Sequence, residues 1–450
     1  MAQTSLDKRK LAIALTLSFA SLSSTQVLAG GISLLESSAA SIGNAHAGGA
    51  AGAEDASTVF QNPAGLTRLP GSHFTAVLSA IDVSAKFANN GSTSAIGTPA
   101  TGGNGGNGGT TAVLPSLFFA TDISPVLKFG IGVFTPIGLK TDYDSDWVGR
   151  YQALKSDVKT ININPSLAYK VSDTVSLGAG VSAQRADAEL TKAVDFGSLC
   201  FANVGPAGCT AFGILPQARD GTVKVKGSDW GYGFNLGALF TLSSDTRVGL
   251  AYRSRIKQEI SGQATFSNPT LPGPFAALTA SRATTDSDAK ANLDLPESVS
   301  ASFFSQLDKR WSIMGDVTWV KWSRLDELRV RFANGAPDSV TPEQWRDTTR
   351  VALAVNYQLS DAWKLRAGAA YDESPVKDDF RTPRVPDNHR VWLAFGAGYR
   401  FSKQDTFDVG YAHLFIKDGP INSVDPSAGR LRGDYEDSAD ILGVQFNHMF

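Results

Sequence analysis

The sequence predicts an all-β protein: a 14-stranded antiparallel transmembrane β-barrel with an N-terminal plug, or hatch, in its lumen. Three observations lead to this fold class. Apolar and polar residues alternate with a period of two over much of the chain after residue 72. Short and long connections between the alternating segments follow one another without exception. The last segment is amphipathic and ends on an aromatic residue, Phe450.

Residues 1–29 show the features of a secretory signal peptide. Lys8, Arg9 and Lys10 form a basic start, an apolar run covers residues 11–20, and small or apolar residues lead up to Ala29. This order predicts export and cleavage near Ala29. The apolar run is too short for a membrane helix, and no later run reaches the roughly 18 apolar residues that such a helix needs. A helical membrane protein is therefore excluded.

The alternation is clear in residues 391–401. Val391 and Phe395 fall on one face of an extended chain, whereas Trp392 and Gly396 fall on the other. Successive strand side chains point to opposite faces, so the segment has one apolar and one mixed face. A soluble β-sandwich also alternates, but its strands usually have only about 3 to 10 residues. Several segments of this chain are longer, which favours a membrane barrel.

The expected strands lie near residues 72–86, 111–122, 126–137, 157–171, 174–194, 220–242, 245–266, 284–307, 310–332, 345–358, 362–372, 387–402, 404–418 and 434–450. Short turns on one side and long loops on the other are typical of outer-membrane barrels, with the short turns in the periplasm. An even number of strands closes antiparallel and leaves no edge in lipid. We therefore expect residues 72–450 to form the barrel, with both chain ends in the periplasm of a bacterial outer membrane.

Composition excludes several partners. The formal net charge is −2, so no strongly basic surface indicates nucleic acid. Cys200 and Cys209 are the only cysteines, and the oxidising compartment that the signal implies predicts a disulfide closing a small loop. No metal site or cofactor is expected. The partners expected are outer-membrane lipid and the barrel-assembly machinery, which would recognise the last strand at Phe450, and the chain is expected to be a monomer.

Residues 30–71 do not alternate and are rich in Ala, Gly and Ser. A segment of this size folds into the lumen as a plug or forms a disordered periplasmic extension. The stretch Asn62, Pro63, Ala64 and Gly65 suits a compact, hydrogen-bonded turn structure, which favours the plug. A 14-stranded barrel without a plug is wide enough to leak.

The chain resembles the long-chain fatty acid transport outer-membrane family of the FadL type, whose other members carry aromatic hydrocarbons. The resemblance spans essentially all of the chain after the signal, and no single motif in it is decisive. The resemblance rests mainly on residues 43–45, 47–48, 54–56, 62–65, 151, 163–166, 295–298, 316, 319, 322, 345, 347–348, 365–368, 371–372, 375–376, 381–383, 386–387 and 390. The resemblance implies external capture of a hydrophobic ligand, an inner pocket, and lateral exit through the barrel wall beside a kinked third strand.

Pro136 and Gly138 are candidates for that kink. Proline donates no hydrogen bond to a strand ladder, and glycine weakens a strand interior. A wall opening needs missing bonds of this kind. The alternative is that the two residues simply begin the loop at 138, and the sequence favours neither reading.

Two of the expected outer loops contain apolar residues that would be exposed to water. The candidates for ligand binding there are Phe196, Phe201, Phe212, Leu215, Leu271 and Phe275. Exposed apolar patches often mark a binding groove. Packing of one loop on the other is the alternative.

A fatty acid also carries a carboxylate, which a buried cation holds by a charge-assisted hydrogen bond. Arg185 is the candidate, because it is expected to face inward and lies near the family position for such a contact. An ordinary lumen charge is the alternative role for Arg185. Lys192 and Arg253 remain further candidates.

These features predict a channel for passive uptake of hydrophobic molecules, with long-chain fatty acids as the main expectation and aromatic hydrocarbons as the alternative. An enzyme is not expected, because neither a Ser–His arrangement nor a nucleophile elbow stands out. A general porin would need a charged, open lumen, whereas many expected inward positions are Gly, Ala, Asn or Leu. An outer-membrane lipid enzyme is the remaining rival.

Overall fold

The computed structural model describes residues 32–450, so the predicted signal peptide lies outside the described part of the chain. Twenty strands form one sheet, which closes where β1 (His73–Asn89) pairs with β20 (Gly429–Met449). Five pairs of consecutive strands each make up one interrupted barrel strand, and β14 pairs only with β13. The wall is therefore a closed, 14-stranded antiparallel barrel, which confirms the predicted fold class.

The uninterrupted barrel strands besides β1 and β20 are β2 (Thr111–Asp122), β5 (Lys155–Lys170), β6 (Val175–Asp195), β7 (Asp220–Thr241), β15 (Thr348–Gln358), β16 (Trp363–Asp372) and β17 (Arg390–Arg400). The interrupted ones are barrel strand 3 (β3, Leu127–Phe134, with β4, Gly138–Asp142), strand 7 (β8, Thr246–Arg253, with β9, Ile256–Ser267), strand 8 (β10, Ser287–Leu295, with β11, Ser298–Gln306), strand 9 (β12, Trp311–Val320, with β13, Glu327–Phe332) and strand 13 (β18, Asp405–Ile416, with β19, Gly419–Asp425). The strand β14 covers Ser339–Pro342.

These breaks divide segments that the alternation pattern treats as continuous, notably 245–266, 284–307 and 310–332. A period of two persists across a short bend, so periodicity alone cannot place the break.

The alternating faces lie as their periodicity predicts. On β17, Phe395 faces outward and is well exposed, whereas Trp392 and Ala394 are buried on the lumen side. Aromatic pairs such as Trp311 with Tyr357 lie near the short turns. Such rings prefer the boundary between lipid and water, so they mark one edge of the apolar band.

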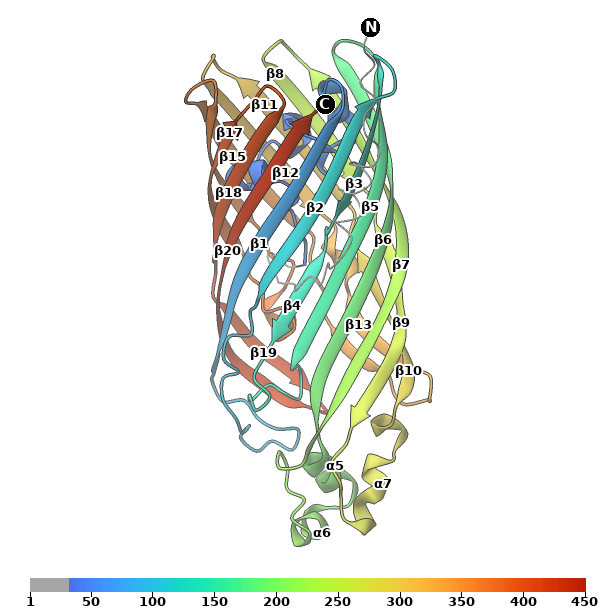
Figure 1. The fold of residues 1–450 in the computed structure, drawn as a ribbon. Coiled ribbons are helices and arrows are strands. Elements are labelled where there is room, and N and C mark those ends of the chain that lie inside the picture. Colours follow the sequence, from blue (N-terminus) through green and yellow to red (C-terminus); the bar gives the residue numbers. More distant parts are fainter. Residues whose placement is uncertain (1–31) are drawn as a thin grey trace.

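The two ends of the barrel differ as expected. The short turns and the C-terminus lie at the top of Figure 1, and the long connections with α5 (Phe196–Asn203), α6 (Pro206–Ala211) and α7 (Ala276–Thr279) lie at the bottom. The bottom end is therefore the extracellular one. None of the helices among residues 32–450 has the length and apolarity needed to cross a membrane.

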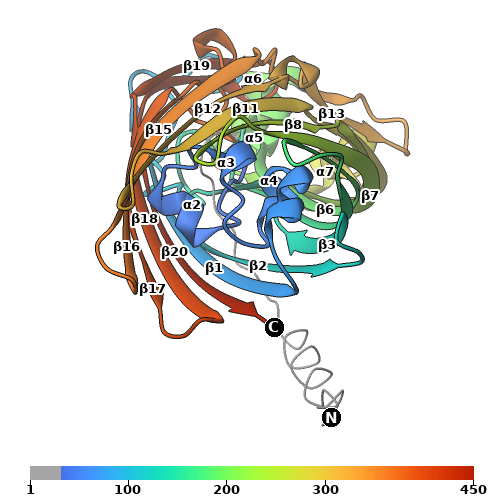
Figure 2. The ribbon, with the colours of Figure 1, turned by 90° about the horizontal axis from the view of Figure 1, so that it is seen from above.

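The remaining short helices are η2 (Gly273–Phe275), η3 (Arg282–Thr284), η4 (Trp322–Arg324) and η5 (Asp378–Phe380) in the connections, and α2 (Ala39–Gly43), α3 (Gly49–Gly52), α4 (Thr58–Gln61) and η1 (Pro63–Arg68) before the first strand. Figure 2 shows α2, α3 and α4 inside the ring of strands. The N-terminal segment is thus a plug in the lumen and not an extension. We call residues 32–71 the hatch.

Polar contacts tie the hatch to strands on several sides of the barrel. Glu54 forms ion pairs with Lys364 and Arg366 at 3.2 Å each. On β8, four barrel strands away, Arg247 donates hydrogen bonds to the carbonyl oxygens of Ala51 and Gly52. Burial of these backbone oxygens without partners would be costly, so the contacts fix the hatch in one position.

Glycines on the inner wall make room for the hatch backbone. A Cβ atom on Gly178 would lie 2.3 Å from the amide nitrogen of Ala64, and one on Gly410 would lie 2.1 Å from the carbonyl oxygen of Ala39. The inward glycines that predict an uncharged lumen are thus also contact points for the hatch.

Candidate ligand-binding site

An apolar cavity, called the lumen cavity below, lies inside the barrel against strands 3 to 8. Its walls include Leu139, Val158, Leu190, Val225, Ile260 and Leu293. These side chains come from six different strands and share the inward face. An apolar ligand gains roughly 25 cal/mol for each Å² of its surface that such walls remove from water. The cavity therefore suits an apolar molecule.

Three polar side chains mark one side of this cavity. Trp345 donates its indole hydrogen to the carboxyl oxygen of Glu343 at 3.1 Å. Arg384 donates to the carbonyl oxygen of Gln152 at 3.0 Å and to the hydroxyl oxygen of Ser156 at 3.0 Å. All three polar residues come from extracellular connections, and strand packing brings them against the apolar walls.

Burial alters the acidity of two of these groups. It raises the pKa of Glu343 to about 8, although Trp345 and Arg384 oppose the shift. It also lowers the pKa of Arg384 to about 10. At neutral pH the cavity therefore holds a protonated acid and a cation side by side. This combination can bind a carboxylate, with one hydrogen-bond donor from each side chain.

A second cavity, the hatch cavity, lies between the hatch and the wall. Its lining includes Leu34, His46, Phe60, Pro136 and Arg253. The Arg253 guanidinium lies 4.7 Å from the centroid of the Phe60 ring and donates one hydrogen bond to the Phe60 carbonyl oxygen.

The wall is interrupted beside this cavity in barrel strand 3. Phe134 pairs with Asn162 and Gly138 with Lys159, so three residues of strand 3 face two of β5. Toward β2, the ladder of strand 3 covers only Leu117–Asp122, which leaves residues 111–116 without a partner there. The missing ladder bonds create a weak point in the wall.

Pro136 lies in this break, and Gly138 begins β4 on its far side. Strand 3 therefore continues past the break, and the two residues do not begin the loop. The hatch holds the break in place, because Leu34 donates to the Pro136 carbonyl oxygen at 2.9 Å and Gly138 donates to that of Ile32 at 3.0 Å.

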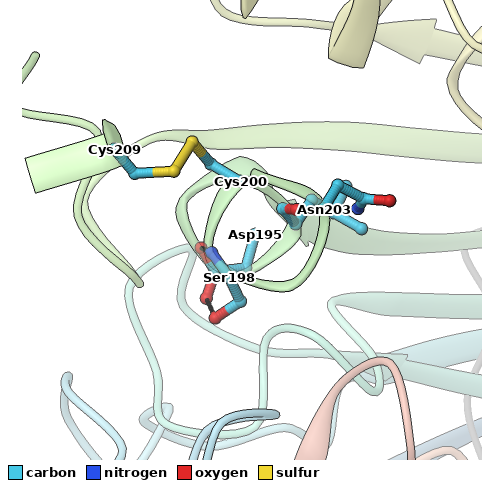
Figure 3. The surroundings of a disulfide bond; sticks show 6 residues. Asp195, Ser198, Cys200, Asn203 and Cys209 are labelled. Carbon is cyan, nitrogen blue, oxygen red and sulfur yellow. Dashed lines mark hydrogen bonds between the residues drawn. A yellow bond between two sulfur atoms is a disulfide. The ribbon is translucent and has the colours of Figure 1, made fainter. Parts of the chain in front are cut away.

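The outer loops pack on each other around a disulfide. Figure 3 shows the Cys200–Cys209 bond, which the sequence predicts and which links α5 to α6. Asp195 caps α5 by accepting a hydrogen bond from the amide of Ser198 at 2.9 Å. A carboxylate at this position satisfies amides that the first helical turn leaves free.

The apolar loop residues divide into two groups. Phe196, Leu271 and Phe275 are buried in the packing between the two loops, so their burial favours the loop-packing alternative. Phe212 and Leu215 are exposed, and Phe201 is partly buried. Only this second group is available to a ligand arriving from outside.

Arg185 does not face the lumen, and its expected role there is wrong. It lies on the same face of β6 as Val181, which is 62% exposed, while Ser182 and Gln184 on the other face are buried. Arg185 instead pairs with Asp187 at 3.0 Å. Residues separated by an even number share a strand face, so the parity that places Val181 outside also places Arg185 outside.

Of the other cations, Lys192 pairs with Asp425 at 3.9 Å in the extracellular part of the barrel, and Arg253 lines the hatch cavity. The sequence does not single out Glu343 or Arg384. The sequence did contain a partial indication of this site, because residues 345 and 381–383, which are close to Glu343 and Arg384, belong to the stretches that carry the family resemblance.

Comparisons with known proteins agree with this architecture. A family model described as outer membrane protein transport protein (OMPP1/FadL/TodX) matches residues 20–450. A putative outer membrane protein of Neisseria meningitidis serogroup B is 32% identical over 89% of this chain and 91% of its own length. The long-chain fatty acid transport protein of Escherichia coli K12 is 30% identical over 100% of this chain and 99% of its own.

Solved structures show the same fold. A Pseudomonas aeruginosa FadL homologue superimposes with a TM-score of 0.85 at 26% identity, covering 93% of this chain and 100% of its own. The Pseudomonas putida toluene transporter TodX gives a TM-score of 0.70 at 18% identity, covering 93% of this chain and 99% of its own, and this likeness concerns the fold alone.

Proposed function

The chain belongs to the outer membrane protein transport family OMPP1/FadL/TodX, and from this premise we propose that it carries long-chain fatty acids inward across the outer membrane. The family is one of transport proteins, so the chain is not an enzyme. The observation that carries the choice of ligand is the lumen cavity, in which apolar walls lie beside Arg384 and Glu343. A fatty acid has the same two parts, an apolar chain and a carboxylate.

The proposed path begins at the outer loops. Phe212 and Leu215 are exposed at the extracellular end and offer an apolar surface for capture. The acid then enters the lumen cavity, where Arg384 and Glu343 hold the carboxylate. It leaves sideways at the break in strand 3, where residues 111–116 of β2 lack ladder partners on strand 3. Since Ile32 and Leu34 bond to this break, movement of the hatch would release it.

Assembly of the barrel belongs to the same proposal. Phe450 is half exposed at the end of the last strand, and the chain backbone bonds there to Ser72. This exposed terminal aromatic on an amphipathic strand is available to the barrel-assembly machinery. The closed wall needs no second copy, which supports a monomer.

The alternative ligand is a monoaromatic hydrocarbon, for which the apolar lining alone would suffice. Uptake of labelled oleate and labelled toluene by cells that lack their own channels of this kind distinguishes the two. We expect the protein to raise oleate uptake much more than toluene uptake. Toluene uptake without oleate uptake would show that the protein is a hydrocarbon channel and not a fatty acid channel. Entry of small sugars with neither ligand would indicate a porin.

A further inference from the structure

Barrel strands 7 and 8 are interrupted at the same height. Strand 7 breaks at residues 254–255 and strand 8 at residues 296–297. The pairs on either side of the breaks are Arg253 with Ser298 and Ile256 with Leu295. The two strands thus bend together and keep their register to each other.

The same bend opens the ladder between strands 6 and 7. β7 pairs with strand 7 on the periplasmic side of the bend at Asn235 with Arg253 and on the extracellular side at Ser228 with Ser261. Between these points lie the six residues 229–234 of β7 and the seven residues 254–260 of strand 7. Within the described chain, no residue of either stretch has a register partner in the other. A run of this length without a ladder is a second weak point in the wall.

Strand 7 moves toward the lumen at this point. Gln258 donates a hydrogen bond to the Gln184 carbonyl oxygen of β6 at 3.3 Å, reaching past β7. The approach requires glycine on β7, because a Cβ atom on Gly231 would lie 2.6 Å from the Lys257 carbonyl oxygen, and one on Gly233 would lie 2.7 Å from Ile256. Ser254 closes one end of the open stretch, since its amide donates to the Phe234 carbonyl oxygen at 2.9 Å and its Oγ accepts the Phe234 amide at 2.8 Å.

The wall is thin at Ser254. This residue and Tyr252 line the hatch cavity on the inside, and both also line a pocket on the outside of the barrel. The outer pocket further contains Tyr232, Phe234, Arg255 and Glu297. It combines aromatic surface with two arginines, Arg255 and Arg324, which pair with Asp294 at 3.7 Å and with Glu297 at 2.7 Å.

Another cation, Arg253, lies on the inner side of the wall. Arg253 lines the hatch cavity, and among the described residues its Nη1 has no hydrogen-bond partner. The break at residues 254–255 interrupts the alternation of faces, so Arg253 lines the inner cavity, Arg255 lines the outer pocket, and Ser254 lines both. A carboxylate that binds the first finds the second directly outside.

We propose that the gap between barrel strands 6 and 7 at Ser254 is a second lateral passage, through which an anionic single-chain amphiphile moves between the hatch cavity and the membrane. The passage rests on the proposed function, because its ligand is the same fatty acid. It adds an exit on a part of the wall four strands away from the break in strand 3.

A unique thiol tests the passage in the folded, full-length protein. The two cysteines of the chain form the disulfide, so Ser254→Cys introduces the only free thiol. Cells carrying this variant are treated with benzyl methanethiosulfonate, and oleate uptake is measured before and after. The added ring should lower uptake at least twofold. Ala301→Cys, on the lipid face of β11, is the matched control and should show no change after the same treatment.

A second readout separates closure of the passage from an effect on the hatch cavity. A photoreactive fatty acid should label Tyr232, which is 73% exposed on the outer face, several times more than the lipid-facing Leu353, and modification at Ser254→Cys should abolish the difference. Equal labelling of both positions, or unchanged uptake after modification, would overturn the passage while leaving the channel function intact. Absence of oleate uptake by the unmodified protein would overturn the proposed function itself.

Discussion

The side-chain amide of Asn62 donates to the carbonyl oxygen of Ala238 on β7 at 3.1 Å, and so joins the hatch to the barrel wall. The same amide donates to the Ala50 carbonyl oxygen at 2.7 Å, and the side-chain oxygen Oδ1 of Asn62 accepts the amide of Ala64 at 3.0 Å. One buried side chain therefore links two parts of the hatch to each other and to the wall. Gly237 makes the contact possible, because a Cβ atom there would lie 1.9 Å from Asn62 Oδ1.

Replacing Asn62 with Ala should loosen the hatch. Each buried partner left without a hydrogen bond costs about 1–3 kcal/mol, whereas the closed sheet of the barrel is untouched. We expect faster entry of a hydrophilic antibiotic, measured as growth inhibition, with normal amounts of folded barrel. Asn203→Ala, on the exposed helix α5, is the control and should not leak. Unchanged permeability in the Asn62 variant would show that other contacts suffice to hold the hatch.

Replacing Arg384 with Gln should weaken oleate binding. The loss of a charge-assisted hydrogen bond costs about 1.5–3 kcal/mol, which corresponds to roughly a 10- to 100-fold change in Kd. Toluene uptake should be nearly unchanged, because a hydrocarbon offers no acceptor. Arg185→Gln is the matched control, since Arg185 lies on the outer face. Binding is measured with a fluorescent fatty acid, and an equal loss for both variants would refute the lumen site.

Glu343 should make stability and binding depend on pH. Burial raises its pKa from 4.5 to about 8, so the folded protein holds this proton more tightly than the unfolded chain does. The group therefore disfavours folding increasingly as the pH rises from 4.5 to about 8, and the penalty is constant above that. Relative to Glu343→Gln, the wild-type unfolding temperature should fall across this window.

Ionisation of Glu343 should also change the affinity for the ligand. Above about pH 8 the ionised Glu343 repels a carboxylate and competes for Arg384, so oleate binding should weaken in the wild type. Glu343→Gln stays neutral and should bind oleate evenly over this range. Glu436→Gln, on the exposed side of β20, should behave as the wild type does. Parallel pH profiles for all three proteins would argue against a buried acid at the site.

A charge on the lipid face should destabilise the barrel. Leu353 is 62% exposed on β15, within the apolar outer face. Leu353→Arg should cost about 2–4 kcal/mol if the position lies near the middle of the bilayer. Val424→Arg is the control, because Val424 is 68% exposed on β19 in the extracellular part. Urea unfolding in lipid vesicles measures both, and equal stabilities would mean that Leu353 does not contact lipid.

Much of the fold could be predicted from sequence because its main signal is local. Val391 and Phe395 alternate with Trp392 and Gly396 in any extended chain, so the two faces follow from spacing alone. The prediction for Arg185 was wrong. The same rule, applied with Val181 as the reference, places the Arg185 side chain on the outer face. The prediction placed Arg185 inward, opposite Val181 and Ala183, but residues 181, 183 and 185 share one face of the strand, and that face is the outer one.

The candidate site was less predictable because it depends on long-range packing. Glu343 and Arg384 come from different connections, and their meeting at one cavity depends on how those connections fold into the barrel. Phe196 and Phe275 look alike in sequence to Phe212, yet loop packing buries the first two and leaves the third exposed.

The number of barrel strands, the short and long ends, and the disulfide could be predicted from the sequence, since each depends on local composition or spacing. The folded chain was needed to show that Pro136 lies in a break within strand 3, where strand 7 breaks, how the hatch docks on inward glycines, and which cations reach a cavity. These depend on contacts between residues far apart in the chain, such as Asn62 with Ala238, and no local pattern encodes such contacts.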